Sequence, residues 1–223
     1  MNLKGLKINF LGDSITQGDV GPASRDFAYH ALLKAECGLA EARNYGINGT
    51  TLSNRQGTPK NEEEEFLFSH SFCQRYEEMD DDADCVVVFG GTNDHSACEA
   101  LLGTFSDRTP DTFYGACHYL FRGLTLKYLG KPVVVMTPLH RDKELDPKGF
   151  HRKFDTGTLK DYVNIIREVA EYYGIPVLDL FAMSAIQPAI PEHKQMYMPD
   201  GIHPNNAGHA IVARKLKTFL EAL

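Results

Sequence analysis

The sequence lacks the signatures of several protein classes. No run of about 18 apolar residues occurs in the 223-residue chain, so we expect no membrane-spanning helix. Neither a dinucleotide-binding G-x-G-x-x-G segment nor a P-loop follows the first expected strand, which argues against a nucleotide cofactor. The H-E-x-x-H motif of zinc hydrolases is also missing. We therefore predict that the protein uses no cofactor and no metal ion.

The few cysteines show no pairing pattern. Their number is odd and none has the C-x-x-C spacing: Cys37, Cys73, Cys85, Cys98 and Cys117. This pattern argues against a disulfide framework or a zinc site and favours reduced thiols in a cytoplasmic protein. Residues 1–6 lead directly into the first expected strand, so we expect no signal peptide.

Composition and charge are those of an ordinary globular protein. Hydrophobic residues make up 43% and charged residues 24% of the chain, and the formal net charge is -7. An acidic balance favours neither nucleic acid nor an anionic membrane surface as a partner. Because the chain has no internal repeat, linker or break in composition, we predict a single domain over residues 1–223.

Strand and helix patterns alternate along the whole chain. Strands are expected at residues 7–11, 41–47, 85–89, 131–136 and 175–179. Helices are expected at residues 25–37 and 61–79, from a Thr109 cap to about 129, from a cap at Asp155 or Thr156 to 173, and after 205. Several strands are apolar throughout, which is typical of a parallel sheet covered on both faces. The pattern predicts a three-layer α/β/α domain with a five-stranded parallel sheet.

Short polar turns follow several of the expected strands. The first is Gly12-Asp13-Ser14, and others contain Gly49, Asn93 and the segment from 200 to 205. In open α/β sheets, ligands bind outside the carboxyl ends of the strands. A serine at such a turn is well placed to act as a nucleophile, although Gly-Asp-Ser is also an ordinary loop tripeptide.

The residue types in these turns suit nucleophilic catalysis. A serine hydroxyl needs a base to remove its proton, and His203 is the candidate base. Asp200 lies three residues earlier and is placed to orient the imidazole. The backbone N–H groups of Ser14 and Gly49 and the side-chain amide of Asn93 are candidate donors for an oxyanion.

Neighbouring polar residues have plainer interpretations. We expect Asp13 and Asp94 to brace their turns rather than to act as catalytic acids. His95 is a candidate substrate-binding residue, with an exposed loop position as the alternative.

In order and spacing, four segments resemble the signature blocks of the SGNH hydrolases, the GDSL-type esterases and lipases. These segments are Gly12-Asp13-Ser14, Gly49, Gly91-Thr92-Asn93-Asp94 and Asp200-x-x-His203-Pro204. The resemblance spans residues 12–204 and implies a flavodoxin-like fold and a serine esterase mechanism without metal or cofactor. It also implies Ser14 as nucleophile, Gly49 and Asn93 as oxyanion donors, His203 as base and Asp200 as its partner.

The sequence therefore predicts a carboxylic-ester hydrolase that forms an acyl-enzyme on Ser14. Family precedent favours a small ester substrate with a short acyl group, such as acetyl on a sugar. Lysophospholipase and thioesterase activities are alternatives within the same family. Two alternatives from other classes are a metal-dependent hydrolase built from Asp13, Asp94, Asp200 and His203, and a non-catalytic carbohydrate-binding module. The sequence does not predict the oligomeric state.

Overall fold

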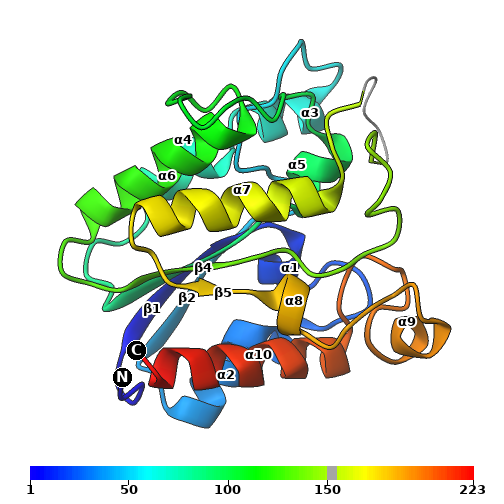
Figure 1. Cartoon of the computed structure of the whole chain (residues 1–223). Helices are drawn as coiled ribbons and strands as arrows, with labels where there is room; N and C mark the ends of the chain where they lie inside the picture. The colour runs from blue at the N-terminus through cyan, green and yellow to red at the C-terminus, as the bar shows by residue number, and fades with distance from the viewer. Residues whose placement is uncertain (150–154) are drawn as a thin grey trace.

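A computed structural model describes residues 1–149 and 155–223 (Figure 1). Five strands form one parallel sheet in the order β2-β1-β3-β4-β5. The strands are β1 (Lys7–Gly12), β2 (Glu41–Gly46), β3 (Cys85–Phe89), β4 (Val133–Met136) and β5 (Val177–Leu178). The predicted five-stranded parallel sheet is confirmed. That the chain forms one domain over residues 1–223 stays a prediction.

Helices cover both faces of the sheet (Figure 1). One face packs against α6 (Phe113–Lys127) and α7 (Leu159–Tyr172), and the other against α2 (Tyr29–Cys37) and α10 (Asn206–Glu221). Successive side chains of a strand point to opposite faces, so an apolar strand between two helical layers is buried throughout. In β3, Val86 and Val88 face the α6 layer, whereas Val87 faces the α10 layer. The predicted three-layer α/β/α arrangement is confirmed.

Shorter elements connect these layers. They are α1 (Ser14–Gln17), η1 (Arg25–Phe27), α3 (Glu62–Phe68), α4 (Phe72–Arg75), η2 (Tyr76–Glu78), α5 (Thr92–Ala97), α8 (Leu180–Met183) and α9 (Pro191–Tyr197). Among the described residues no helix is long and apolar enough to cross a membrane.

Two of the expected helices are interrupted. The helix expected at 25–37 breaks at Ala28, whose backbone is extended (φ -58°, ψ 143°) and which is fully buried against Gly18. The helix expected at 61–79 divides into α3, α4 and η2. Ser71 starts α4 as a new N-cap, and the Phe72 N–H donates to the Thr51 carbonyl at 2.8 Å. Tertiary contacts therefore override the helical periodicity at both places.

Two expected helix starts are also wrong. The N-cap of α6 is Thr112, whose side chain accepts a hydrogen bond from the Gly115 N–H, and not Thr109. The N-cap of α7 is Thr158, which forms a capping box with Asp161, and not Asp155 or Thr156. In each case a side-chain acceptor closer to the helix satisfies its first free N–H groups.

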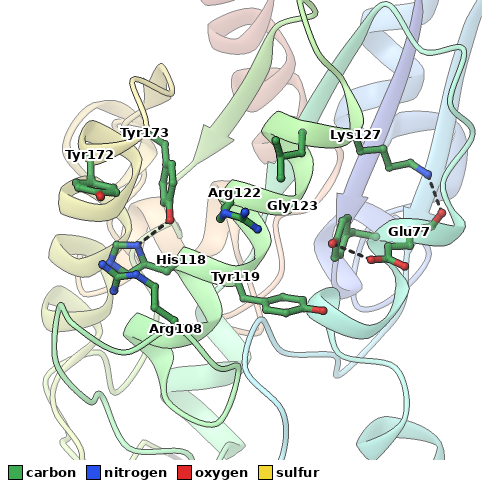
Figure 2. Close-up of a pocket in the computed structure, with 11 residues that line it drawn as sticks. Glu77, Arg108, His118, Tyr119, Arg122, Gly123, Lys127, Tyr172 and Tyr173 are labelled. Carbon is green, nitrogen blue, oxygen red and sulfur yellow. Dashed lines mark hydrogen bonds between the residues drawn. The ribbon is translucent and has the colours of Figure 1, made fainter.

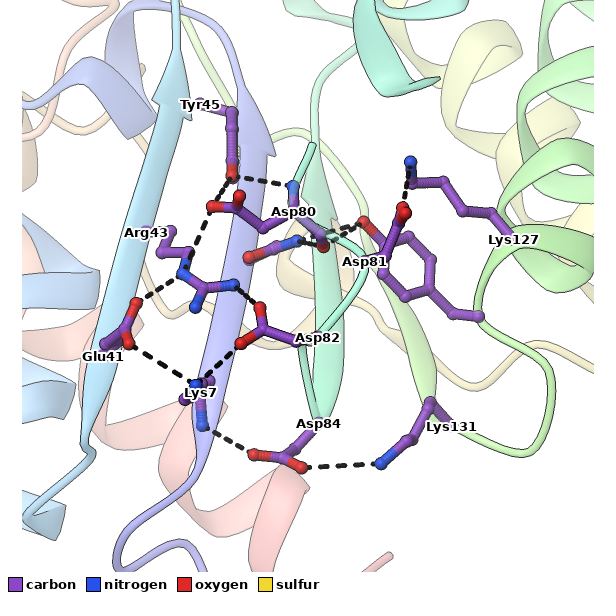
Figure 3. Close-up of polar contacts among 12 residues, drawn as sticks. Lys7, Glu41, Arg43, Tyr45, Asp80, Asp81, Asp82, Asp84, Lys127 and Lys131 are labelled. Carbon is purple, nitrogen blue, oxygen red and sulfur yellow. Dashed lines mark hydrogen bonds and ion pairs between the residues drawn. The ribbon is translucent and has the colours of Figure 1, made fainter. Parts of the chain in front are cut away.

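A charged network joins the strands at the end of the sheet opposite the polar turns (Figure 3). The Lys7 ammonium of β1 pairs with Asp82 at 2.7 Å, and the Lys7 N–H donates to Asp84 at 2.9 Å. Arg43 of β2 pairs with Asp82 and with Glu41. The network fixes the connector before β3 to β1 and β2, so it has a structural explanation.

Candidate active site

The first polar turn places Ser14 at the carboxyl end of β1. Asp13 is the N-cap of α1, and its carboxylate accepts a hydrogen bond from the Ile15 N–H at 3.0 Å. A Cβ on Gly12 would lie 1.9 Å from Thr16 Oγ1, so the tight turn requires glycine. Ser14 is consequently the first residue of a helix, and its own N–H is one of the donors that α1 leaves without a helical acceptor.

A chain of hydrogen bonds runs from Ser14 to Asp200. The Ser14 hydroxyl lies 3.0 Å from His203 Nε2, and His203 Nδ1 lies 2.8 Å from Asp200 Oδ2. With Nδ1–H donating to the carboxylate, the neutral imidazole presents Nε2 as the acceptor for the Ser14 hydroxyl. The structure therefore brings together three side chains that the sequence places up to 189 residues apart.

The Asp200 carboxylate is held in its ionised form. Its Oδ1 accepts hydrogen bonds from the His203 N–H at 2.7 Å and the Ile202 N–H at 2.9 Å. Burial raises the pKa of Asp200, but these backbone bonds and the imidazole outweigh burial and hold the pKa below its usual value. The other carboxylate oxygen, Oδ2, fixes the orientation of the His203 ring through Nδ1.

Three potential oxyanion donors lie in the turns after β1, β2 and β3. Gly49 adopts φ +75°, which favours glycine, and the Asn93 amide donates to the neighbouring Thr50 carbonyl at 3.0 Å. Within the described ranges, neither the Ser14 N–H nor the Gly49 N–H donates to a protein acceptor. The second N–H of the Asn93 amide is also available, because a primary amide carries two donors.

Asp94 ties the turn after β3 to the loop after β2. Its carboxylate accepts hydrogen bonds from the Leu52 N–H at 3.0 Å, the Ser53 N–H at 2.9 Å and the Ser53 hydroxyl at 2.6 Å. Burial raises its pKa against the opposing effect of these bonds. Burial likewise raises the pKa of Asp13 to about 6. The hydrogen bonds of Asp13 and Asp94 give both carboxylates a bracing role.

Comparison with known proteins shows the family to which the chain belongs. Residues 10–211 match the model of the GDSL-like lipase/acylhydrolase family. The chain belongs to this family. Membership makes it a carboxylic-ester hydrolase of the GDSL type. No curated protein sequence matches the chain significantly.

Solved structures extend the comparison over the full chain. One crystal structure is 33% identical, with a TM-score of 0.84 and coverage of 100% of this chain and 99% of its own. A protein from Lactobacillus plantarum is 30% identical, with a TM-score of 0.81 and 98% of each chain covered. A crystal structure of an acetyl xylan esterase is 23% identical, with a TM-score of 0.63, and covers 96% of this chain and 100% of its own. At that identity the esterase shows likeness of fold alone.

For His95 of this GDSL hydrolase, the sequence predicts a substrate-binding residue, with an exposed loop position as the alternative. It belongs to α5 rather than to a loop, and it is fully buried. Its Nε2 is 3.0 Å from the Asp146 carbonyl, and its ring packs edge-on against Tyr162. Residues two apart on a helix face different sides, so the helix that presents Asn93 to the site directs His95 into the core.

Two buried arginines near the site were missed by sequence reasoning. Arg141 follows β4 and donates to the Thr92 carbonyl at 3.0 Å and the Thr92 hydroxyl at 2.9 Å, which holds the start of α5. Arg75 ends α4 and is almost as fully buried. Burial lowers the pKa of each to about 10, so both stay charged at neutral pH. Each stands in a segment without a motif, so no local pattern could distinguish it from a surface arginine.

The metal-hydrolase alternative requires Asp13, Asp94, Asp200 and His203 to converge on one ion. The four residues of the metal-hydrolase alternative do not form a group that could hold a metal ion among the described residues.

A groove of about 1050 Å³ lies on the outer side of α6, between η2 and the end of α7 (Figure 2). It is lined by Arg108, His118, Arg122 and several tyrosines, and by none of the predicted site residues. The predicted site residues of the GDSL hydrolase therefore lie outside this groove.

Proposed function

We propose that the protein hydrolyses esters through an acyl-enzyme on Ser14, with His203 as general base and Asp200 as the group that orients it. One observation carries the proposal, the hydrogen-bond chain of 3.0 Å and 2.8 Å from Ser14 through His203 to Asp200. Such a chain activates a hydroxyl that is otherwise a weak nucleophile. A binding module has no use for it, which argues against the non-catalytic alternative.

Acylation uses each group of the site. The Ser14 oxygen attacks the ester carbonyl carbon while His203 Nε2 takes the hydroxyl proton. The carbonyl oxygen becomes an oxyanion that accepts hydrogen bonds from the Ser14 N–H, the Gly49 N–H and the Asn93 amide. The tetrahedral intermediate then breaks its bond to the alcohol oxygen, which receives the proton from His203. The alcohol leaves and the acyl group stays on Ser14.

Deacylation repeats these steps with water. His203 removes a proton from a water molecule, whose oxygen attacks the acyl carbon. The same three donors bind the second oxyanion. The intermediate breaks its bond to the Ser14 oxygen, which regains a proton from His203. The carboxylic acid leaves, and the ionised Asp200 stabilises the imidazolium in both halves of the cycle.

For the substrate we propose a short acyl group, such as acetyl, on a sugar or another small polar alcohol. Charged groups beside the triad support a polar substrate. The Asp142 carboxylate packs against Gly201, between the two triad residues Asp200 and His203, and pairs with Lys194. An acetyl xylan esterase of similar fold supports this choice.

The test is hydrolysis of 4-nitrophenyl esters from acetate to palmitate by wild type, Ser14→Ala and Ser24→Ala. Ser24 is exposed and its hydroxyl makes no hydrogen bond in the described structure, so its variant is the matched control. We expect Ser14→Ala alone to abolish hydrolysis, and wild-type kcat/KM to fall with chain length. A rise with chain length supports the lysophospholipase alternative, and preference for acyl-CoA supports a thioesterase. Unchanged hydrolysis by Ser14→Ala overturns the proposal.

We also propose that the protein works in a reducing compartment, namely the cytoplasm. All five cysteines are free thiols, and four of them are buried. Burial raises the pKa of Cys85 to about 12 and that of Cys98 to about 11, which keeps these thiols protonated and unreactive. Fractionation of cells that express the tagged protein is the measurement, and recovery outside the cytoplasm would contradict the proposal.

A further inference from the structure

Arg75 has an unusual set of hydrogen-bond partners for a buried cation. Its Nη2 donates to the Gly12 carbonyl at 2.7 Å and to the Thr50 hydroxyl at 3.1 Å, and its Nε donates to the His70 carbonyl at 3.1 Å. Its Nη1 donates to the Tyr45 carbonyl. The side chain is only 6% exposed and makes no ion pair with a described carboxylate. Its donors are therefore used on four backbone and hydroxyl oxygens, which belong to the end of β1, the stretch from Tyr45 to Thr50 and the residues before α4.

These contacts join the segments that carry two of the three oxyanion donors. Gly12 directly precedes the Asp13-Ser14 turn, and Thr50 directly follows Gly49. The Ile47 N–H also donates to the Gly12 carbonyl at 3.1 Å, so both segments meet at the oxygen that Arg75 binds. A guanidinium is planar and rigid, so it fixes the spacing between its acceptors more firmly than a flexible ammonium does. The distance between the Ser14 and Gly49 N–H groups thereby depends on Arg75.

The charge of Arg75 also bears on the reaction. Its carbonyl partners solvate the guanidinium but do not neutralise it, and among carboxylates the buried Asp13 has the largest effect on its pKa, followed by Glu78. A fixed positive charge in a region with little water favours the negative charge that develops on the oxyanion. The ground-state ester is uncharged, so this effect lowers the barrier without strengthening substrate binding.

We propose that Arg75 is a positioning residue of the ester-hydrolysis site, which sets the separation of the Ser14 and Gly49 donors and places a positive charge behind them. The inference rests on the proposed function, since it assigns a role in forming the oxyanion site. It differs from a structural role, in which Arg75 would only fasten α4 to the sheet.

The test compares kcat and KM for 4-nitrophenyl acetate in wild type, Arg75→Lys, Arg75→Ala and the control Arg122→Ala. Arg122 is exposed on α6, and its side chain makes no hydrogen bond in the described structure. We expect kcat to fall about 100-fold in Arg75→Ala, as for the loss of one oxyanion donor, with KM changed less than about threefold. Arg75→Lys keeps the charge but cannot bridge the four acceptors, so its kcat should stay at least about tenfold below wild type. Arg122→Ala should match wild type.

Chemical rescue by added guanidinium distinguishes the positioning role of Arg75 from a purely structural role. Guanidinium at low millimolar concentration should raise kcat of Arg75→Ala several-fold and leave wild type and Ser14→Ala unchanged. Circular dichroism at the assay temperature checks that the variants are folded, and Arg75→Lys serves alone where Arg75→Ala does not fold. A lower melting temperature with wild-type kcat in the folded variants would overturn the inference. If Ser14→Ala still hydrolyses the ester, the proposed function fails instead.

Discussion

Gly21 packs directly against His203. A Cβ on Gly21 would lie 2.8 Å from His203 Cβ and 3.1 Å from Asp200 Oδ2. Gly21 belongs to the segment after α1, so the chain returns past the nucleophile to cover the Asp200–His203 hydrogen bond. The backbone at Gly21 has φ +76°, where other residues are strained. Glycine is thus required here for the position of the base as well as for the conformation.

Gly21→Ala should lower kcat without unfolding the protein. The added methyl group has to displace the His203 ring, and a displacement of about 1 Å at a catalytic group can cost about 100-fold in rate. Gly130→Ala is a matched control, because Gly130 has φ +75° and no atom near the added Cβ. Both variants should lose about 1–2 kcal/mol from backbone strain. Steady-state kinetics and thermal unfolding separate the two effects, and equal kcat in both variants would show that Gly21 does not control His203.

Asn93→Ala should reduce kcat by about 100- to 1000-fold with little change in KM, the result expected for removal of one oxyanion donor. The fold should persist, because Asp94 still holds the loop after β2 through three hydrogen bonds. The control is Asn164→Ala, because the exposed Asn164 side chain accepts a hydrogen bond from Arg167 on the surface of α7. A kcat within threefold of wild type would remove Asn93 from the reaction.

Much of the fold could be predicted because the sheet leaves a direct mark on the sequence. Strands such as Cys85–Phe89 are apolar at every position, since both faces are covered, and strand and helix patterns alternate strictly. The breaks at Ala28 and Ser71 could not be predicted, because they depend on contacts with Gly18 and Thr51 that are distant in sequence. Local periodicity contains no information about such contacts.

The candidate site, like the fold, contains residues that could be predicted from the sequence and residues that could not. The predicted site residues occur in short polar segments, and their residue types indicate nucleophilic catalysis: Ser14, Gly49, Asn93, Asp200 and His203. Arg75 donates mostly to carbonyl groups, and any residue supplies a carbonyl, so its partners leave no trace in the sequence. His95 shows the opposite relation between sequence and structure. It stands beside a motif but is directed into the core by the helix that presents Asn93.

His209 is buried in α10 and should make the stability of the protein depend on pH. Its Nδ1 accepts a hydrogen bond from the Tyr29 N–H at 3.3 Å, and its ring stacks on the Tyr29 ring. Burial, together with the neighbouring His30 and His203, lowers the pKa of His209 from 6.5 to about 4. Between these two values the unfolded chain binds a proton that the folded protein does not. The contribution of His209 to the free energy of unfolding is therefore fully present above about pH 6.5 and is lost as the pH falls to about 4.

The shift corresponds to roughly 3 kcal/mol of unfolding free energy. Asp13 acts in the opposite direction, because its raised pKa of about 6 lets the folded state take up a proton first and gain stability on acidification. The pH dependence of wild-type stability therefore contains contributions from both His209 and Asp13. His209→Asn keeps an acceptor for the Tyr29 N–H and removes the titration of His209. It also removes the ring stacking on Tyr29, a loss that does not depend on pH. Urea unfolding from pH 7.5 to 4.5 should show the variant gaining on wild type steadily below about pH 6.5. A difference independent of pH would mean that His209 is not the group that the folded state keeps neutral.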